Sequence, residues 1–290
     1  MVRKPIVAGM FYEDDFGRLD EQINKCFKNS KFGPGELPTK KREKEIMGVI
    51  APHAGYQFSG PGQAWVYKEI GESKLPDVFI ILGTNHTGIG KSSTLLDDFE
   101  TPFGIVKIDK EFTKSLIDKG WVIQSKDVHD QEHSIEVQLP FLQFVQRDHL
   151  NKLRIVPVAV SQGSNYELFG KAVAKIAKEQ EKKICLIASS DFTHYGVNYG
   201  YVPFVYNIKE SLEALDMGAI EYIKKLDAWS FIDYVESNKA TICGAYAIAV
   251  LIEACKALGA KKVELMQYYT SGDIVKDYAN AVGYASIIIK

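Results

Sequence analysis

The sequence predicts an α/β protein with a mainly parallel central sheet and helices on both faces. Short apolar runs alternate with segments of helical periodicity from residue 46 to the C-terminus, which favours strand–helix–strand crossovers. The run Val78–Leu82 is apolar at every position, as expected for a strand buried on both faces. A content of 46% hydrophobic and 25% charged residues is typical of an ordinary globular protein.

The predicted strands are short, largely apolar runs. They are Ile46–Ala51, Val78–Leu82, Leu153–Val160, Ile184–Ala188, Val263–Tyr269 and Ala281–Ile289. The first four strands are separated by enough chain for crossover connections, so they are expected to be parallel. The last two follow each other closely and are expected to add an antiparallel edge.

The predicted helices lie between these strands. They are Ser59–Glu69, Ser134–Val145, Tyr166–Lys178, Ile208–Lys224 and Cys243–Leu258. Pro140 lies near the middle of the second, which implies a kink or a late start. The last is rich in alanine and ends at Gly259, a residue typical of helix C-termini.

The organisation of the chain indicates a single domain over residues 1–290. The most linker-like stretch, Gly33–Glu45, is expected to separate an N-terminal arm or helix from the first core strand. A net charge of -2 gives no overall field that would recruit nucleic acid. The longest apolar runs are too short to span a bilayer, and the N-terminus lacks a signal-peptide pattern.

The four cysteines are scattered and form no C-x-x-C pair. This spacing argues against a disulfide framework and a zinc ribbon, and we expect the protein to be cytoplasmic.

Three of the six histidines follow predicted strands at equivalent positions. His53 follows Ile46–Ala51, His86 follows Val78–Leu82, and His194 follows Ile184–Ala188. A single histidine at a strand end often does no more than bond to nearby backbone. Because open parallel sheets bind ligands beyond the carboxyl ends of their strands, three together indicate a shared site.

Cys243 opens the last predicted helix, with small residues after it. A helix N-terminus stabilises a thiolate, which is the form that binds metals. The alternative is a small buried hydrophobe, the role expected for Cys185 and Cys255. Both interpretations of Cys243 stay open from the residues alone.

A further cluster of histidines and acids runs from Asp127 to Glu136. Its acids complement the N-terminus of the helix that follows, and this explains some of them without a functional role. His133 is a candidate to line the cleft as a proton carrier or as a partner of a ligand. We expect His129 and His149 at the surface.

Six segments in order along the chain resemble a known family. They are Arg3–Tyr12, Pro52–Tyr56, Gly83–His86, Glu132–Glu136, Ser189–Gly196 and Cys243–Gly244. Together they resemble the Memo family, whose prokaryotic members are also called the B component of the AmmeMemoRadiSam system. This name implies a radical-SAM partner protein.

The resemblance implies a fold like that of class III extradiol ring-cleaving dioxygenases, which hold non-haem Fe(II) with two histidines and a glutamate. His53 and His86 match the two histidines, and Cys243 stands near the place of the carboxylate. Memo proteins are associated with iron or copper and with redox activity, and in eukaryotes with phosphotyrosine signalling. A thiolate in this position departs from the dioxygenase pattern and favours copper, iron or zinc.

The leading hypothesis is therefore a metal-dependent oxidoreductase or redox-metal binder with His53, His86 and Cys243 as ligands. Asp191 would orient a ligand or His194, while His194 and His133 would transfer protons. A second hypothesis is a non-catalytic module that binds a peptide or metabolite in the same cleft. Tyr56, Phe58 and Tyr195 are expected to line that cleft. A third hypothesis is a zinc hydrolase, since three ligands and a water are a catalytic zinc arrangement.

Overall fold

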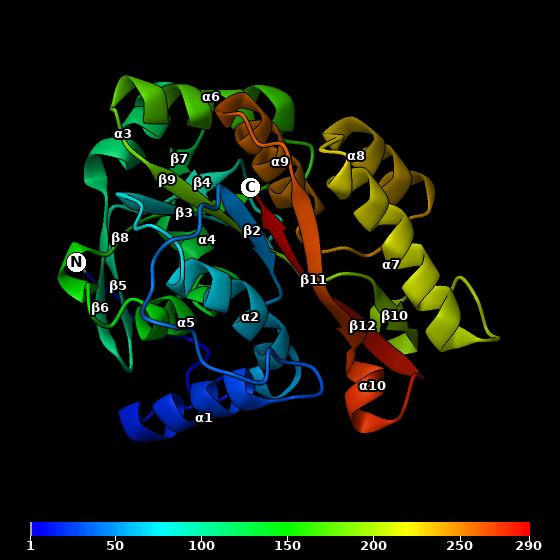
Figure 1. Ribbon diagram of the computed structural model, residues 1–290. Helices are drawn as coiled ribbons and strands as arrows, with labels where there is room; N and C mark the ends of the chain where they lie inside the picture. Colours follow the sequence, from blue (N-terminus) through cyan, green and yellow to red (C-terminus); the bar gives the residue numbers. More distant parts are fainter. Residues whose placement is uncertain (1) are drawn as a thin grey trace.

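A computed structural model describes residues 2–290 and shows one mixed sheet with helices packed around it (Figure 1). Its central strands run parallel in the order β6, β8, β3, β9 and β2. Their bounds are Gly104–Ile108, Arg154–Val160, Val78–Thr84, Ile184–Ser189 and Gly48–Ala51. Every residue of β3 is buried, as its unbroken apolar run predicts. The predicted α/β class with a mainly parallel sheet is confirmed.

The C-terminal strands are antiparallel, also as predicted. β12 (Asn280–Ile289) pairs with β2 near its end and with β10 (His194–Gly196) at its start, while β11 (Val263–Thr270) runs along its other side. β11 therefore forms the outer strand, while β12 is enclosed and buried over nearly its whole length. The opposite edge carries short strands that the sequence pattern did not reveal. They are β1 (Val2–Arg3), β4 (Ser93–Thr94), β5 (Asp98–Thr101) and β7 (Ile123–Gln124).

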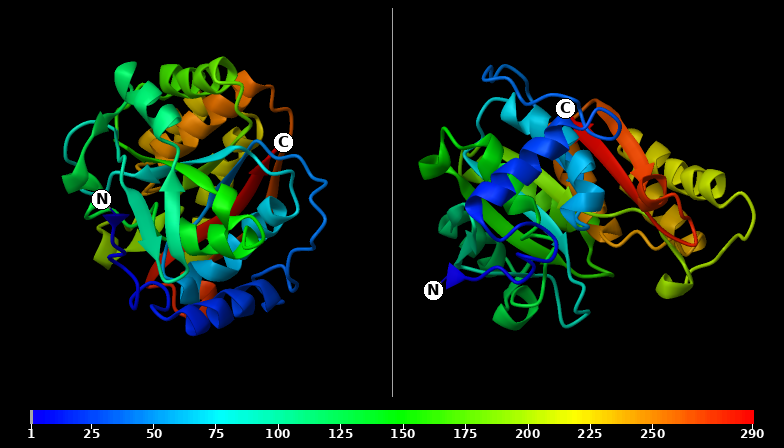
Figure 2. Two further views of the ribbon diagram at one scale, coloured as in Figure 1. Left: turned by 90° about the vertical axis from the view of Figure 1, so that its left-hand side faces the viewer. Right: turned by 90° about the horizontal axis from the view of Figure 1, so that it is seen from below.

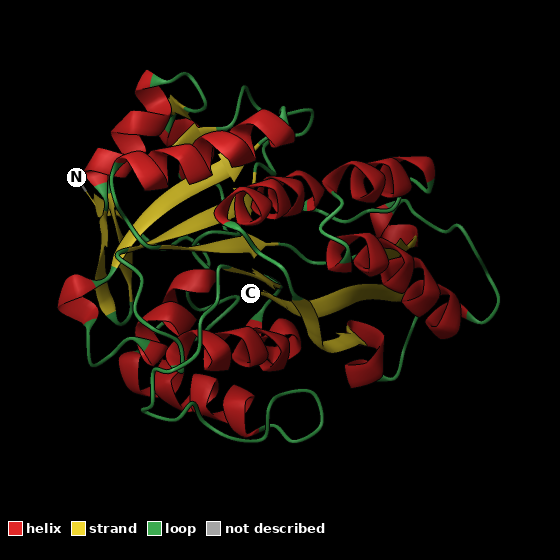
Figure 3. Cartoon of the chain, turned by 45° about the horizontal axis from the view of Figure 1, so that its top comes forward, coloured by secondary structure: helices red, strands yellow, loops and turns green. Residues whose placement is uncertain are grey.

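Helices cover both faces of the sheet, and the strands lie between them (Figure 3). One face carries α3 (Lys110–Asp118), α6 (Tyr166–Glu179), α7 (Ile208–Lys224), α8 (Ala228–Ser237) and α9 (Ala245–Leu258). The other carries α1 (Phe16–Lys28), α2 (Tyr56–Gly71) and α5 (Gln138–Val145). On that face α1 packs on α2 at the outside of the molecule (Figure 2). The apolar residues accordingly form two large clusters, one on each side of the sheet.

Shorter helices complete the chain, and two helix boundaries matter for the site. The short helices are α4 (Lys126–His129), α10 (Ser271–Val275) and the 3₁₀ turns Leu150–Lys152 and Val197–Tyr199. α5 begins late, so Pro140 lies in its first turn, where a missing N–H breaks no helical hydrogen bond. α9 begins at Ala245, so Cys243 lies two residues before the helix rather than inside it. Across residues 2–290, the helices lack the length and apolar content that a bilayer crossing requires.

Candidate metal centre

The candidate centre lies at the carboxyl ends of three neighbouring parallel strands, β3, β9 and β2. His86 follows β3 and His53 follows β2, and their ring centroids are 5.3 Å apart. Asp191 and His194 follow β9, the strand between them. Parallel strands deliver the residues after them to one edge of the sheet, and this is why residues far apart in sequence meet here.

His133 brings a third imidazole to this point from the loop before α5. Its ring centroid lies 5.4 Å from that of His53 and 4.8 Å from that of His86. One nitrogen from each of the three rings lies within 4.8 Å of the other two, a spacing at which they can hold a metal ion. From the sequence, His133 was expected to carry protons, and the structure places it among the potential ligands.

Cys243 joins the three histidines through its sulfur. Its Sγ lies 3.3 Å from His53 Nε2, and the backbone N–H of Asp191 donates to the sulfur over 3.3 Å. Metal–nitrogen and metal–sulfur bonds of about 2.0 and 2.3 Å imply a nitrogen–sulfur separation of roughly 3.0–3.5 Å across one ion. The distance observed between His53 and Cys243 falls in that range, so the donor set fits a metal of the iron, copper or zinc kind.

A chain of buried hydrogen bonds determines which nitrogen of His53 carries the proton. Ser189 donates its hydroxyl hydrogen to the carbonyl of Ser134 at 2.7 Å and accepts a bond from the Gln138 amide at 2.8 Å. Ser189 Oγ can therefore only accept from His53 Nδ1, which lies 3.0 Å away. His53 Nε2 keeps its lone pair, and this lone pair faces the sulfur of Cys243.

His86 is oriented by a buried carboxylate. Glu132 accepts from His86 Nδ1 at 3.0 and 3.1 Å and from the backbone N–H groups of His86 and Ser134 at 2.9 and 2.7 Å. This is the carboxylate–histidine arrangement that turns the other ring nitrogen toward a metal. Glu132 was not predicted to act here, although its position directly before His133 was a usable signal.

The pKa values of the histidines differ because their surroundings differ. Burial lowers the pKa of His53 well below its usual value, and the nearby His133 and His86 lower it further. Burial also lowers the pKa of His133. Burial acts in the same direction on His86, but hydrogen bonds to Cys243 and Glu132 outweigh it and raise the pKa to about 10. Burial raises the pKa of Glu132, yet its bond with His86 brings it to about 2.

His86 and Glu132 thus form an ion pair in the metal-free protein. His53 and His133 stay neutral and available as ligands, whereas a metal ion must displace a proton from His86.

Asp191 and His194 support the centre from the loop after β9. The buried carboxylate of Asp191 accepts the backbone N–H of His53 at 2.7 Å, which holds the loop that carries His53. Burial raises the pKa of Asp191, and the neighbouring His194 opposes that shift. His194 Nδ1 lies 3.0 Å from the carbonyl of Thr241 and donates to it.

A cavity of about 1040 Å³ opens beside these groups. His86, His194 and Cys243 form its inner wall, and Lys239 and Tyr246 are among the residues that line the rest. The expected aromatic residues do not line it. Tyr56 and Tyr195 are buried and bond to the carbonyls of Val137 and Phe204. The phenol of Tyr199 lines the cavity instead.

The prediction for His129 was wrong. Its side chain is buried, with 1% of the residue exposed, and burial lowers its pKa to about 4. His149 is about one-third exposed and lies outside the centre. Cys185 and Cys255 are buried in β9 and α9, as predicted. The alternation pattern did not reveal His129 because α4 is a single turn, too short to show a buried face.

The N-terminal arm holds the segment that carries Glu132 and His133. The carboxylate of Glu136 accepts the backbone N–H groups of Ile6 and Val7, the hydroxyl of Tyr12 and the guanidinium of Arg3. Arg3 also donates to the carbonyls of Glu132 and His129, at 2.7 and 3.1 Å. The side chains of Arg3, Tyr12 and Glu136 are all buried, so this network holds the ligand loop firmly against the sheet.

Fold and site together define an α/β protein with a three-histidine cluster, able to hold a metal ion, at the carboxyl edge of its sheet. The family model described as "Memo-like protein" matches residues 3–288, and the chain belongs to this family.

Full-length relatives named MEMO1 family protein support the assignment. One from Methanopyrus kandleri is 40% identical and covers 100% of this chain and 99% of its own. One from Methanococcus maripaludis strain C6 is 41% identical over 100% of both chains. One from Nitrosopumilus maritimus is 40% identical over 99% of both. Among solved structures, an uncharacterized protein of Escherichia coli K12 matches at 11% identity and a TM-score of 0.49, covering 84% of this chain and 100% of its own.

Proposed function

We propose that this centre holds iron or copper through His53, His86 and Cys243, with His133 as a further donor, and that it serves redox chemistry. The observation that carries the proposal is the 3.3 Å approach of His53 Nε2 to the Cys243 sulfur beside two more imidazoles. Thiolate and imidazole donors favour copper, iron and zinc over magnesium and calcium. A bound iron or copper ion would supply one-electron chemistry and a Lewis acid.

The residues of this chain would prepare the site before any metal arrives. Glu132 holds His86 with Nδ1 turned away from the centre, and Ser189 does the same for His53. Both rings thus lose little freedom on binding an ion. His194 lines the adjoining cavity and would exchange a proton there with a small molecule.

The test is metal analysis of protein purified under nitrogen and supplied with Fe(II), Cu(I) or Zn(II) in turn. We expect stoichiometric iron or copper in the parent and a loss of at least tenfold in affinity in His53→Ala and Cys243→Ser. His149→Ala is the matched control, since His149 lies outside the centre. If both site variants bind iron and copper as the parent does, the proposal is wrong. Stoichiometric zinc with oxygen-independent hydrolysis would favour the hydrolase hypothesis instead.

A second candidate function is binding of a peptide or metabolite without turnover. The size of the cavity favours it, because about 1040 Å³ reaches the upper end of the range for small-molecule sites. Tight peptide or metabolite binding that survives chelation and the Cys243→Ser change would support this alternative. Binding that requires the metal would support the redox proposal.

A further inference from the structure

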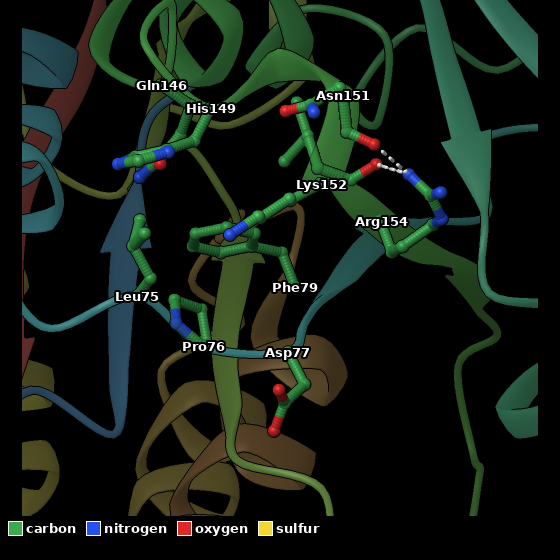
Figure 4. A pocket seen from close by; sticks show the side chains of 10 residues that line it. Leu75, Pro76, Asp77, Phe79, Gln146, His149, Asn151, Lys152 and Arg154 are labelled. Atoms are coloured by element: carbon green, nitrogen blue, oxygen red, sulfur yellow. Dashed lines mark hydrogen bonds between the residues drawn. The ribbon is translucent and has the colours of Figure 1, made fainter.

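A second cavity lies at the opposite end of the sheet, beside the amino ends of β3 and β8 (Figure 4). Its walls come from the segment before β3, the end of α5 and the turn before β8. Its volume is about 470 Å³, within the range of small-ligand sites. It shares none of its lining residues with the cavity beside the metal centre.

One side of this cavity is apolar. Phe79 offers its ring there, and Leu75 and Pro76 add two half-buried side chains. In Figure 4 Leu75 lies to the left of the Phe79 ring, and Pro76 lies below it. Such a surface suits a planar apolar group, because ring and aliphatic faces pack against it without leaving a polar atom unpaired.

The other side carries an uncompensated positive charge. Lys152 extends into the cavity in Figure 4 and has no ion-pair partner among residues 2–290. Arg154 Nη1 donates to the carbonyls of Asn151 and Leu153 at 3.0 and 2.8 Å, which holds the turn that carries Lys152.

The acids nearby do not neutralise Lys152. The carboxylate of Asp77 accepts the backbone N–H of Lys183 at 2.7 Å, and in Figure 4 it points away from Lys152. Asp148 Oδ1 lies 2.7 Å from the guanidinium of Arg42. Its Oδ2 lies 3.5 Å from His149 Nε2, so each of the two oxygens has a partner other than Lys152. An anion entering the cavity would therefore meet Lys152 without a competing carboxylate.

Gln146 places a buried amide at the wall of this cavity. Only 2% of the residue is exposed, and its Nε2 has no hydrogen-bond partner among the described residues. A buried amide without an acceptor is unfavourable. The Nε2 atom itself is buried, and a half-turn of the terminal amide would present the NH₂ group to an acceptor in the cavity while Oε1 takes the buried position.

We propose that this cavity binds a small organic carboxylate with a planar apolar body. The carboxylate would accept hydrogen bonds from Lys152 Nζ and the Gln146 amide, while the body would pack on Phe79, Leu75 and Pro76. The proposal is independent of the metal centre, since neither the charge nor the apolar surface comes from residues of that site.

The test is titration of chelator-treated, full-length protein with benzoate, followed by NMR chemical shifts. Benzamide serves as the neutral isostere and inorganic phosphate as the anion without an apolar body. We expect saturable benzoate binding, with both other probes at least fivefold weaker. Lys152→Gln and Leu75→Trp should each weaken benzoate binding at least fivefold. Lys114→Gln is the matched control, because Lys114 is exposed on α3 away from the cavity and should leave binding unchanged.

Three results would overturn the proposal. One is the absence of saturable binding up to roughly 20 mM benzoate, which corresponds to a negligible affinity. Another is equal affinity for benzoate and benzamide, because it would exclude recognition of the charge. The third is weakening by Cys243→Ser with no effect of Lys152→Gln or Leu75→Trp, since it would place benzoate beside the metal centre.

Discussion

The two ends of the sheet are built in opposite ways. At the carboxyl end, the nitrogens of His53 and His86 that face away from the centre are each tied to a buried partner, Ser189 or Glu132. At the amino end, Lys152 and the amide nitrogen of Gln146 have no described partner. A site for an ion needs fixed donors, because the ion tolerates little error in distance. A site for an organic ligand can leave donors free for the ligand to satisfy.

The largest expected effect comes from breaking the network that holds the carboxyl end. Among residues 2–290, Glu136 is the only residue whose carboxylate pairs with the buried Arg3. Glu136→Gln removes that charge, and we expect the free energy of unfolding to fall by about 3–5 kcal/mol. Urea denaturation measures this change. Glu100→Gln in β5 is the control, because its partner in the same arm, Lys4, is exposed and the pair should contribute less than about 1 kcal/mol. Equal effects of the two changes would show that Glu136 does not anchor the arm.

A second prediction concerns a buried acid at the same end. Asp216 accepts from Thr193 Oγ1 at 2.5 Å and from Tyr268 at 2.7 Å, and burial raises its pKa to about 6. An unfolded chain ionises this group near pH 4, so the folded state binds the extra proton between pH 4 and 6. The stability contribution is therefore complete below pH 4 and is lost as the pH rises through 6, by roughly 3 kcal/mol.

Asp216→Asn lacks this loss. Between pH 4 and pH 7 the parent should therefore lose stability relative to the variant. Urea denaturation at several pH values measures the shift. A difference that stays constant across this range would contradict the prediction.

A third prediction tests whether a buried carboxylate fixes a donor at the carboxyl end but not at the amino end of the sheet. Glu132→Gln keeps the shape of the side chain but removes the charge that orients His86, and we expect metal affinity to fall about 10- to 100-fold. Competition with a chromogenic chelator gives the affinity. The benzoate affinity of the amino-end cavity should not change, because none of its lining residues contacts Glu132. Unchanged metal affinity in Glu132→Gln would mean that Glu132 does not help to hold the metal.

The smallest expected effect comes from Ser189→Ala. The change removes the acceptor of His53 Nδ1, a single neutral hydrogen bond worth about 0.5–1.5 kcal/mol, so metal affinity should fall roughly 2- to 12-fold. Ser73→Ala is the control, since its hydroxyl is buried and bonds the carbonyl of Glu69 far from the centre. It should lower stability without changing metal affinity. A loss of metal affinity in both variants would mean that Ser189→Ala lowers metal affinity only by lowering the stability of the fold.

Much of the fold was predictable because its signals are local. Val78–Leu82 is apolar at every position, and the limits of α7 follow directly from its periodicity. The edge strands β4 and β7 were not predictable, since two residues each carry no period. His129 was misjudged for the same reason. His53, His86 and Cys243 were predicted to share a site, and the structure brings them together with His133.

By itself the sequence determined the α/β class, the family and the strand ends at which His53 and His86 appear. These depend on local periodicity and on ordered motifs, which a linear chain displays. Only the tertiary structure decided that Glu132 bonds His86, that Ser189 sets the proton of His53, and that Gln146 is left without an acceptor. Such roles depend on distances between residues from separate elements, and hydrogen bonds form only when packing brings donor and acceptor within about 3 Å.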